Sequence, residues 1–380
     1  MANEVQIYKG AIDKGLEGIV ACSTKISSII DVTLTYRGYI IEDLAANSNF
    51  EETVFLLWND RLPKTEELSQ FQKTLRDNMK LDSGYVDLLK KLPTENVHPM
   101  AWLRTAVSTL ALWDEQAQEE SSEANHHKAI WLTAKMASIV AAFERIRTGK
   151  ELIAPRNDKS IGWNFLYMLK GTEPDEQFAK VFDTCLVLHA DHELNCSAFA
   201  ARVTASSLSD MYSSVVSAIS ALKGPLHGGA NEQVMRMLLE IGTMDNARPW
   251  VKEALVGKRK IMGFGHRVYK NGDPRAKILR GMSETLGKKI GQPQWYQMSS
   301  HIDDTVQAEK GLLPNVDFYS ATVYYSMGIP IDMYTPIFAV SRISGWIAHI
   351  FEQLTNNRIY RPRGDYVGKL GLKWVEPSQR

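Results

Sequence analysis

From residue 41 onward, apolar side chains recur at intervals of three and four residues, the spacing of one face of an α-helix. The spacing is clear at Leu68, Phe71, Leu75 and Met79. It continues through most of the chain, so it predicts a mainly α-helical fold. About the first 45 residues are richer in β-branched and turn residues, which predict short strands or extended loops before the helical body.

Proline and glycine mark where several helices begin or end. Asp273–Pro274 and Thr335–Pro336 each combine a capping side chain with a proline in the first turn, so we expect a helix to begin at each. Residues 197–222 are rich in Ala and Ser and predict one long helix ending at Lys223. Small side chains let neighbouring helices approach closely, which favours a central or subunit-interface helix.

Composition limits the function classes. The 380 residues contain 44 Lys plus Arg and 44 Asp plus Glu, so no overall basic field favours nucleic acid. No apolar run approaches the length of a membrane span, and the N-terminus lacks the apolar core of a signal peptide. The three cysteines form no CxxC pair. We therefore expect a cytoplasmic protein that binds neither membrane nor nucleic acid.

One basic stretch, residues 258–277, predicts a local anion site. Its cations surround the turn Gly263–Phe264–Gly265, and His266 follows directly. Lysine and arginine suit phosphates, glycine permits close backbone approach, and imidazole exchanges protons near neutral pH. A dinucleotide fingerprint is disfavoured because Val268 stands where the third glycine is required. A solvated surface patch is the plainer alternative.

Two further histidine neighbourhoods are candidates. His189 and His192 are three residues apart, which would put both on one helical face, and Glu193 follows. This pattern matches no familiar metal motif, so core histidines and a metal-dependent hydrolase site both stay open, the second as the remote alternative. His227, in GPLHGGANEQ, precedes a predicted helix whose dipole keeps the imidazole neutral. A neutral imidazole can donate a hydrogen bond to a carbonyl that becomes an enolate.

Three more charged residues can be interpreted from their local sequence. Asp317, in NVDFYS, is by itself best explained as a helix cap. Arg342 lies among apolar residues in IFAVSRISGW, where a buried charge requires a partner such as a ligand carboxylate. Arg361 alone would be a surface residue.

Six ordered motifs resemble those of the citrate synthase family. They are LHADHE, GPLHGGANE, GFGHRVYKNGDPR, NVDFYS, VSRISGW and YRPR. The closest likeness is to the shorter bacterial and archaeal forms, since DHELN is one residue shorter than the mitochondrial-type DHEGGN. The resemblance implies a mostly helical homodimer with two domains per subunit, a large one (1–223 and 329–380) and a smaller one (224–328) that closes over the ligands.

The resemblance also implies a role for each candidate residue. Asp317 would remove a methyl proton from acetyl-CoA, His227 would stabilise the enolate, and His266 would protonate the oxaloacetate carbonyl. Oxaloacetate would be held by His192, Arg275, Arg342 and, from the other subunit, Arg361. The CoA phosphates would be lined by Lys258, Arg259, Lys260, Ile261, Met262, Gly263 and Arg267. Citryl-CoA would then be hydrolysed, so no metal or redox cofactor is implied.

Two alternatives stay open beside this reading. 2-Methylcitrate synthases share the motifs and use propionyl-CoA, and one methylene changes selectivity by only about 10–200-fold in an apolar pocket. A dual activity is therefore compatible with the sequence. A non-catalytic CoA-binding protein is disfavoured because Asp317 and both catalytic histidines are present.

Overall fold

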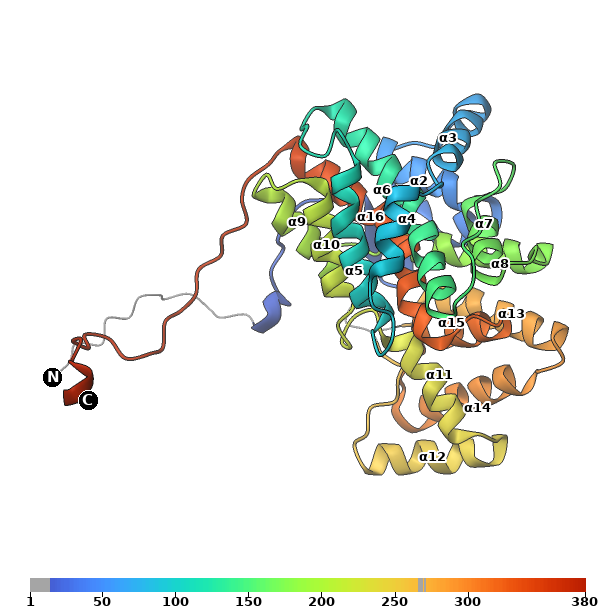
Figure 1. Ribbon diagram of the computed structural model, residues 1–380. Helices are drawn as coiled ribbons and strands as arrows, with labels where there is room; N and C mark the ends of the chain where they lie inside the picture. The colour runs from blue at the N-terminus through green and yellow to red at the C-terminus, as the bar shows by residue number, and fades with distance from the viewer. Residues whose placement is uncertain (1–13, 266–268, 270) are drawn as a thin grey trace. The chain divides into compact units, whose positions relative to one another are not determined.

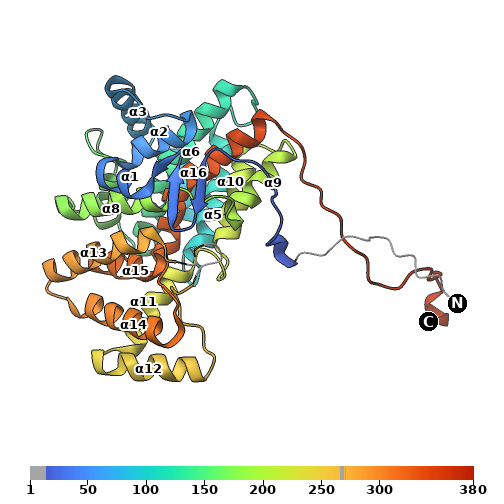
Figure 2. The same cartoon turned by 180° about the vertical axis from the view of Figure 1, so that it is seen from behind.

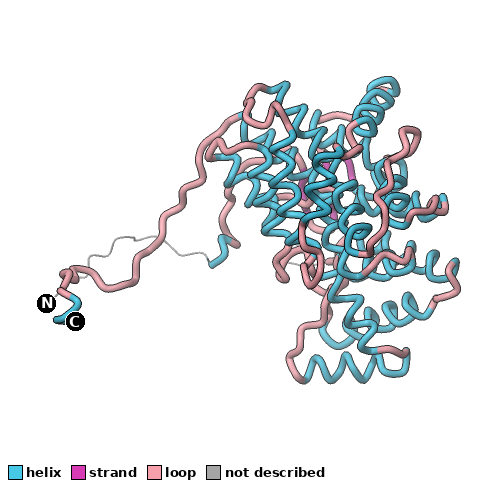
Figure 3. The backbone as a smooth tube through the Cα atoms, viewed as in Figure 1, coloured by secondary structure: helices cyan, strands magenta, loops and turns pink. Residues whose placement is uncertain are grey.

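The computed structural model describes residues 14–265, 269 and 271–380, and it confirms the predicted mainly α-helical fold (Figures 1 and 3). The chain divides into two compact units. One is Thr24–Arg358, which contains nearly all the secondary structure. The other combines the two ends of the chain, and its described residues are all exposed or half-buried. Its secondary structure, among these residues, consists of 3₁₀ turns at Lys14–Leu16 and Pro377–Gln379. Among the described residues, no helix is both long and apolar enough to cross a membrane.

A small antiparallel sheet precedes the helices, as the early β-branched residues predict. Its strands are β1 (Ser27–Ile30), β2 (Thr33–Tyr36) and β3 (Tyr39–Ile40), in the order β1-β2-β3. Ser27 pairs with Tyr36 in the β1–β2 register. Side chains alternate between the two faces of a strand, and Leu34 and Tyr36 of β2 are both fully buried.

Helices make up the rest of Thr24–Arg358. Those of the first half are α1 (Ile41–Asn47), α2 (Phe50–Asn59), α3 (Thr65–Asp77), α4 (Ser83–Lys91), α5 (Pro99–Leu110), α6 (Ser122–Arg147), α7 (Ile161–Lys170) and α8 (Glu176–His189). Those of the second half are α9 (Cys196–Ser206), α10 (Met211–Leu222), α11 (Ala230–Ile241), α12 (Met244–Val256), α13 (Pro274–Lys289), α14 (Gln294–Lys310), α15 (Val316–Ser326) and α16 (Tyr334–Thr355). Two 3₁₀ turns, Ala111–Trp113 and Ile331–Met333, lie between them.

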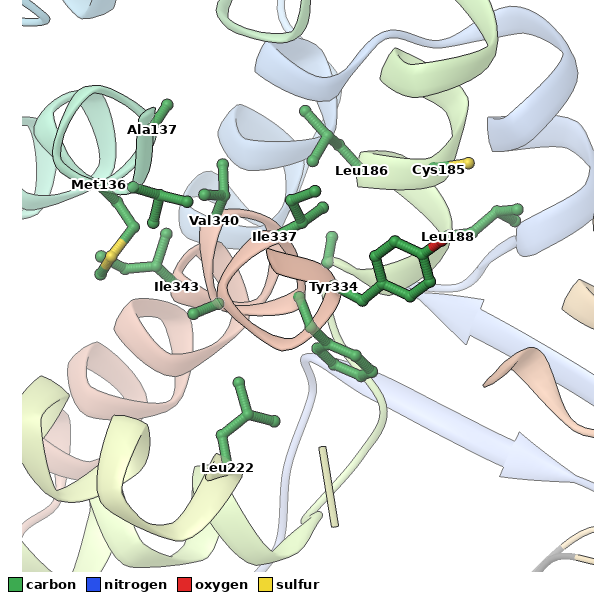
Figure 4. Close-up of a cluster of buried hydrophobic side chains, with 14 of the residues drawn as sticks. Met136, Ala137, Cys185, Leu186, Leu188, Leu222, Tyr334, Ile337, Val340 and Ile343 are labelled. Atoms are coloured by element: carbon green, nitrogen blue, oxygen red, sulfur yellow. The ribbon is translucent and has the colours of Figure 1, made fainter. Parts of the chain in front are cut away.

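Helix α16 lies at the centre of the core. It contacts α2, α5, α6, α8, α9 and α10. Figure 4 shows Ile337, Val340 and Ile343 of this helix facing Met136 of α6 and Leu186 of α8. All five side chains are fully buried, and burying one such side chain contributes about 1.5–3 kcal/mol. The core therefore fixes the position of α16 and of every polar side chain on it.

Helices α11 to α15 pack mainly on one another. Contacts join α13 with α15, α11 with α15, and α12 with α14, and Figures 1 and 2 show the five helices together. These helices fall within residues 224–328, the predicted smaller domain. The predicted domain boundaries themselves stay a prediction.

The sequence prediction of one long helix over residues 197–222 is wrong. The segment forms two helices, α9 and α10, which pack against each other. Leu208 adopts φ of +62°, which ends α9, and the Asp210 side chain caps α10 by accepting a hydrogen bond from the Ser213 N–H at 2.9 Å. Helical spacing alone could not reveal this break, because the turn residues Ser207, Leu208 and Ser209 are of the same kinds as the residues of the flanking helices.

Two other predicted helix boundaries need correction. The helix expected to begin at Thr335–Pro336 begins at Tyr334, and the Thr335 hydroxyl donates to the Gly228 carbonyl at 3.3 Å instead of capping its own helix. Helix α8 ends at His189, so His189 and His192 do not share a helical face. The start at Asp273–Pro274 is confirmed, with the Asp273 carboxylate accepting from the Arg275 N–H.

Candidate active site

The loop that carries His192 is hydrogen-bonded to strands β1 and β2. Residues 190–195 follow α8. The Tyr36 hydroxyl of β2 donates to the Asp191 carbonyl at 2.9 Å, and the Glu193 N–H donates to the Ser27 hydroxyl of β1 at 2.7 Å. The early sheet therefore fixes this loop. His192 is buried, and its Nε2 lies 3.3 Å from the Tyr269 hydroxyl.

Helix α16 reaches the same loop through a glycine. The Gly345 N–H donates to the Ala190 carbonyl at 3.1 Å, and a Cβ at position 345 would lie 2.3 Å from the Asp191 carboxylate. No larger residue fits there without a shift of the loop. The other Asp191 contacts are a hydrogen bond from the Ser27 hydroxyl and His349 Nε2 at 3.3 Å.

His227 is a neutral imidazole whose tautomer is set by its neighbours. It lies in the turn before α11, and its Nε2 is 3.2 Å from the Ser197 N–H and 2.8 Å from the Ser197 hydroxyl. A backbone N–H can only donate, so Nε2 is the acceptor and Nδ1 carries the proton. Burial first, and then the positive charge of Arg342, lowers the pKa of His227 to about 4. The ring can therefore donate one hydrogen bond from Nδ1 without being charged.

Asp317 is a buried carboxylate with an unusual pKa. It lies in the first turn of α15, which is capped by the Asn315 side chain, so the plain reading of Asp317 as the cap is wrong. The pKa of Asp317 is raised to about 7, chiefly by burial; the Arg275 charge opposes the rise and the Asp273 charge adds to it. Its Oδ1 is buried and has no hydrogen-bond partner among the described residues. A carboxylate in this state is suited to accept a proton near neutral pH.

Arg342 is a buried guanidinium without a carboxylate partner in the described part of the chain. It is 1% exposed, its Nε donates to the His189 carbonyl at 2.8 Å, and it lies over the Phe338 ring. No ion pair within 4.0 Å is formed by Arg342 among residues 14–265, 269 and 271–380. Burial lowers its pKa to about 10, while Asp191 opposes that effect. An anionic ligand would supply the missing countercharge.

Arg275 is equally buried but is already paired. Its Nε and one terminal nitrogen donate to the two Asp273 carboxylate oxygens at 3.0 and 2.8 Å. Burial acts to lower the pKa of Arg275, but the Asp273 charge raises it above its ordinary value. The fork between the two side chains fixes the orientation of Arg275 beside Asp317.

The predicted anion-binding stretch leads into a turn that is hydrogen-bonded to the start of α15. The Asn315 N–H donates to the Gly263 carbonyl at 2.9 Å, and the Asn315 side chain donates to the Gly265 carbonyl at 3.0 Å. Gly263 has φ of +81°, and a Cβ there would lie 2.8 Å from Val234 and 2.9 Å from Phe318, so only glycine fits.

The side chains of the predicted CoA stretch differ in their surroundings. Lys258 and Lys260 are exposed, and exposed Arg259 pairs with Glu240 at 2.8 Å. Ile261 and Gly263 are buried and Met262 is half-buried. His266 and Arg267 lie outside the described residues.

The last two candidates, His189 and Arg361, have different surroundings. His189 is fully buried, its Nδ1 lies 2.7 Å from the Cys185 carbonyl, and burial lowers its pKa to about 3, which identifies a neutral core histidine. Across the described ranges, no group of three His, Cys, Asp or Glu side chains is placed to hold a metal ion. Arg361 is exposed and belongs to the unit formed by the chain ends.

Sequence reasoning missed the roles of four residues. Ser197 contacts His227, Tyr269 contacts His192, and the Asp191 charge acts on Arg342. The Asp273 carboxylate, besides capping α13, accepts a hydrogen bond from the Val316 N–H of α15 at 3.1 Å. Ser197 and Tyr269 carry no signal in a single sequence, because a serine or tyrosine near a histidine is common. Asp191 could have been found, since a carboxylate between two histidines in an apolar stretch requires a partner.

The fold is mainly α-helical, and the site combines the kinds of groups that proton removal from carbon requires. A carboxylate that titrates near neutrality lies in one electrostatic cluster with a neutral imidazole donor and two buried arginines, which suits enolisation of a carbonyl compound next to an anionic partner.

Comparison with known proteins identifies the family. The sequence profile described as "Citrate synthase, C-terminal domain" matches residues 15–363. Citrate synthase 2 of Bacillus subtilis is 54% identical over 367 residues, covering 97% of this chain and 99% of that one. 2-Methylcitrate synthase 1 of Corynebacterium glutamicum is 42% identical over 379 residues, covering 97% and 98%.

A solved structure agrees with the sequence comparison. The ternary complex of carboxymethyl coenzyme A and oxaloacetate with citrate synthase from Thermoplasma acidophilum has a TM-score of 0.91 and 32% identity, covering 98% of this chain and all of that one. The chain belongs to the citrate synthase family and is an enzyme of the acyltransferase class.

Proposed function

We propose that this enzyme condenses acetyl-CoA with oxaloacetate and hydrolyses the resulting citryl-CoA to citrate and CoA. The observation that carries the proposal is that buried Asp317, with its pKa raised to about 7, and neutral His227, whose Nδ1 carries the proton, both feel the charge of buried Arg342. The methyl group of a thioester is a very weak carbon acid, so its deprotonation needs a base and a hydrogen-bond donor together.

The reaction begins with proton transfer from the acetyl methyl group to the Asp317 carboxylate. The His227 Nδ1–H donates a hydrogen bond to the thioester oxygen, where the negative charge develops. The enolate carbon then forms a bond with the ketone carbon of oxaloacetate, and His266 donates a proton to the ketone oxygen. Water finally cleaves the thioester and releases CoA, so the reaction requires neither a metal nor a redox cofactor.

Oxaloacetate is held by the buried cations. Arg342 has no carboxylate partner among the described residues, and a substrate carboxylate supplies one. Arg275 keeps one terminal nitrogen outside its hydrogen bonds to Asp273, and His192 contributes a ring nitrogen. In a homodimer, Arg361 of the partner subunit completes the clamp.

CoA is held by the basic stretch. Exposed Lys258 and Lys260, together with Arg267, attract the phosphates, and Arg259 joins them if it leaves Glu240. The backbone of Ile261, Met262 and Gly263 lies beside them in sequence and leads to Asp317 through Asn315. We place the enzyme in the cytoplasm, because three cysteines without a CxxC pair fit a reducing compartment.

A thiol-release assay with oxaloacetate tests this proposal and its main alternative. We expect acetyl-CoA to give a higher kcat/KM than propionyl-CoA. The reverse order would identify a 2-methylcitrate synthase, which the similarity to the Corynebacterium glutamicum protein keeps as the second candidate. Absence of thiol release with both thioesters would reject the proposal.

A further inference from the structure

A hydrogen bond joins the central helix to Ser197, the residue that contacts the His227 imidazole. The Trp346 indole N–H, in the middle of α16, donates to the Ser197 hydroxyl at 2.9 Å. Both residues are fully buried. The same hydroxyl lies 2.8 Å from His227 Nε2. The indole is thus one residue removed from the catalytic imidazole.

The chemistry of these groups leaves few arrangements. An indole N–H can only donate, so one lone pair of the Ser197 oxygen is occupied by Trp346. The hydroxyl has a single proton and two acceptors in reach, His227 Nε2 at 2.8 Å and the Asn195 side-chain oxygen at 2.8 Å. With the indole in place, the hydroxyl cannot turn away from these two directions. A donor on the oxygen also polarises its O–H bond and strengthens the hydrogen bond that it gives.

We propose that Trp346 is a positioning residue for His227, acting through Ser197. By holding the Ser197 hydroxyl beside Nε2, it adds a second contact to the one from the Ser197 N–H and so fixes the ring with its Nδ1 proton toward the place where the thioester oxygen binds. The inference rests on the proposed function, because it assigns Trp346 to the enolisation step. It also gives α16 two roles on one face, since Arg342 and Trp346 are four residues apart.

The test begins with Trp346→Phe, which keeps an aromatic ring and removes the N–H. We expect kcat to fall by about two- to tenfold, the range that corresponds to one neutral hydrogen bond, with the KM for oxaloacetate unchanged. Trp102→Phe is the matched control, because Trp102 is also buried but its N–H has no partner among the described residues. That control should leave kcat unchanged. If Trp346→Phe does not fold, β-(3-benzothienyl)alanine at position 346 replaces N–H by sulfur in the same two-ring shape.

A double-mutant cycle separates positioning from packing. In a Ser197→Ala background the hydroxyl is gone, so removing the indole N–H should have no further effect on kcat. Equal losses in the wild-type and Ser197→Ala backgrounds would overturn the inference, as would full kcat in Trp346→Phe. Thiol release by the wild-type enzyme in the same assay tests the proposed function separately, so the two ideas can fail independently.

Discussion

The Val316 N–H donates a hydrogen bond to the Asp273 carboxylate at 3.1 Å, although the two residues are 43 positions apart. The same carboxylate caps α13 and pairs with Arg275. Asp273 therefore holds the first turn of α15, which carries Asp317, and the buried Arg275 in one arrangement. Its negative charge also helps to raise the pKa of Asp317.

Replacing Asp273 by Asn should change the pH dependence of the enzyme. The substitution removes a charge that raises the pKa of Asp317 and leaves Arg275, which lowers it, without its partner. The pKa of Asp317 should fall, so the acidic limb of kcat/KM should move to lower pH. Removing one partner of a buried ion pair also costs about 3–5 kcal/mol of stability. The pH profile and the unfolding temperature measure the two effects.

Asp303→Asn is the control for this variant. Asp303 is another buried carboxylate that binds α15, accepting from the Tyr319 hydroxyl at 2.7 Å and pairing with Arg280 at 3.2 Å. It should lower stability without moving the pH profile. An identical shift in both variants would show that the profile reports general loosening of α15 and not the charge of Asp273.

Asp317→Asn should retain the fold and lose most turnover, because an amide cannot accept the methyl proton. The loss of a positioned base typically costs about 10²–10⁴-fold in rate. Near-normal kcat in a folded variant would exclude Asp317 as the base.

The wild-type pH profile checks the same assignment. Asp317 acts as a base only when ionised, and its pKa is raised to about 7. The kcat/KM value should therefore fall tenfold per pH unit well below pH 7 and level off above it. A flat profile between pH 5 and about 7 would contradict the assignment.

Two interacting carboxyl groups, Asp183 and Glu51, have no role in the proposed reaction, but they predict how stability depends on pH. Asp183 of α8 accepts from the Phe50 N–H at the start of α2, and Glu51 of α2 accepts from the Ile161 N–H at the start of α7. Burial raises both carboxyl pKa values, and the Glu51 charge raises that of Asp183 further. The folded protein thus holds a proton that the unfolded chain releases above about pH 4.

Asp183→Asn should therefore gain stability relative to wild type as the pH rises. A raised carboxyl pKa in the folded state contributes stability at low pH, and this stability is lost as the pH approaches the folded pKa. Unfolding temperatures at pH 5, 6.5 and 8 measure the difference. Asp158→Asn, at an exposed carboxylate whose pKa is lowered by Arg156, should show no such gain. If the difference in unfolding temperature between wild type and Asp183→Asn is the same at all three pH values, the folded protein does not hold this extra proton.

A residue's role could be predicted from the sequence where it depends on near neighbours in the chain, and not where it depends on how distant helices pack. Helical spacing predicted α3, and the capping residue with its proline predicted the start of α13, because both signals are local in sequence. A buried charge without a local partner singled out Arg342. Asp273 could be predicted as the cap of α13, but its bond to Val316 depends on how two distant helices pack. Ser197 and Trp346 could not be predicted as partners for the same reason, since 149 positions separate them.

The last prediction concerns the source of Arg361. We propose a homodimer in which Arg361 of each chain completes the site of the other, so Arg361→Ala and Asp317→Asn homodimers should each be nearly inactive. In a mixed dimer, the Asp317-containing subunit receives the intact Arg361 of the partner subunit, while the other site carries both defects. One site in each mixed dimer is therefore whole.

If the chains exchange freely in equal amounts, about half of the dimers are mixed, and total activity should recover to roughly one quarter of wild type. Mass spectrometry of differently tagged chains must first establish that mixing has occurred, because unmixed chains would also show no recovery. The matched control is Arg380→Ala mixed with Asp317→Asn: Arg380 is another exposed arginine of the same C-terminal segment, with no proposed role in the site. The Arg380→Ala homodimer should be fully active, and mixing should leave the total at the level of its own sites. Confirmed mixed dimers of Arg361→Ala and Asp317→Asn that regain no activity would show that Arg361 does not act across the dimer interface, because an arginine that served only its own subunit would leave both sites of every mixed dimer defective.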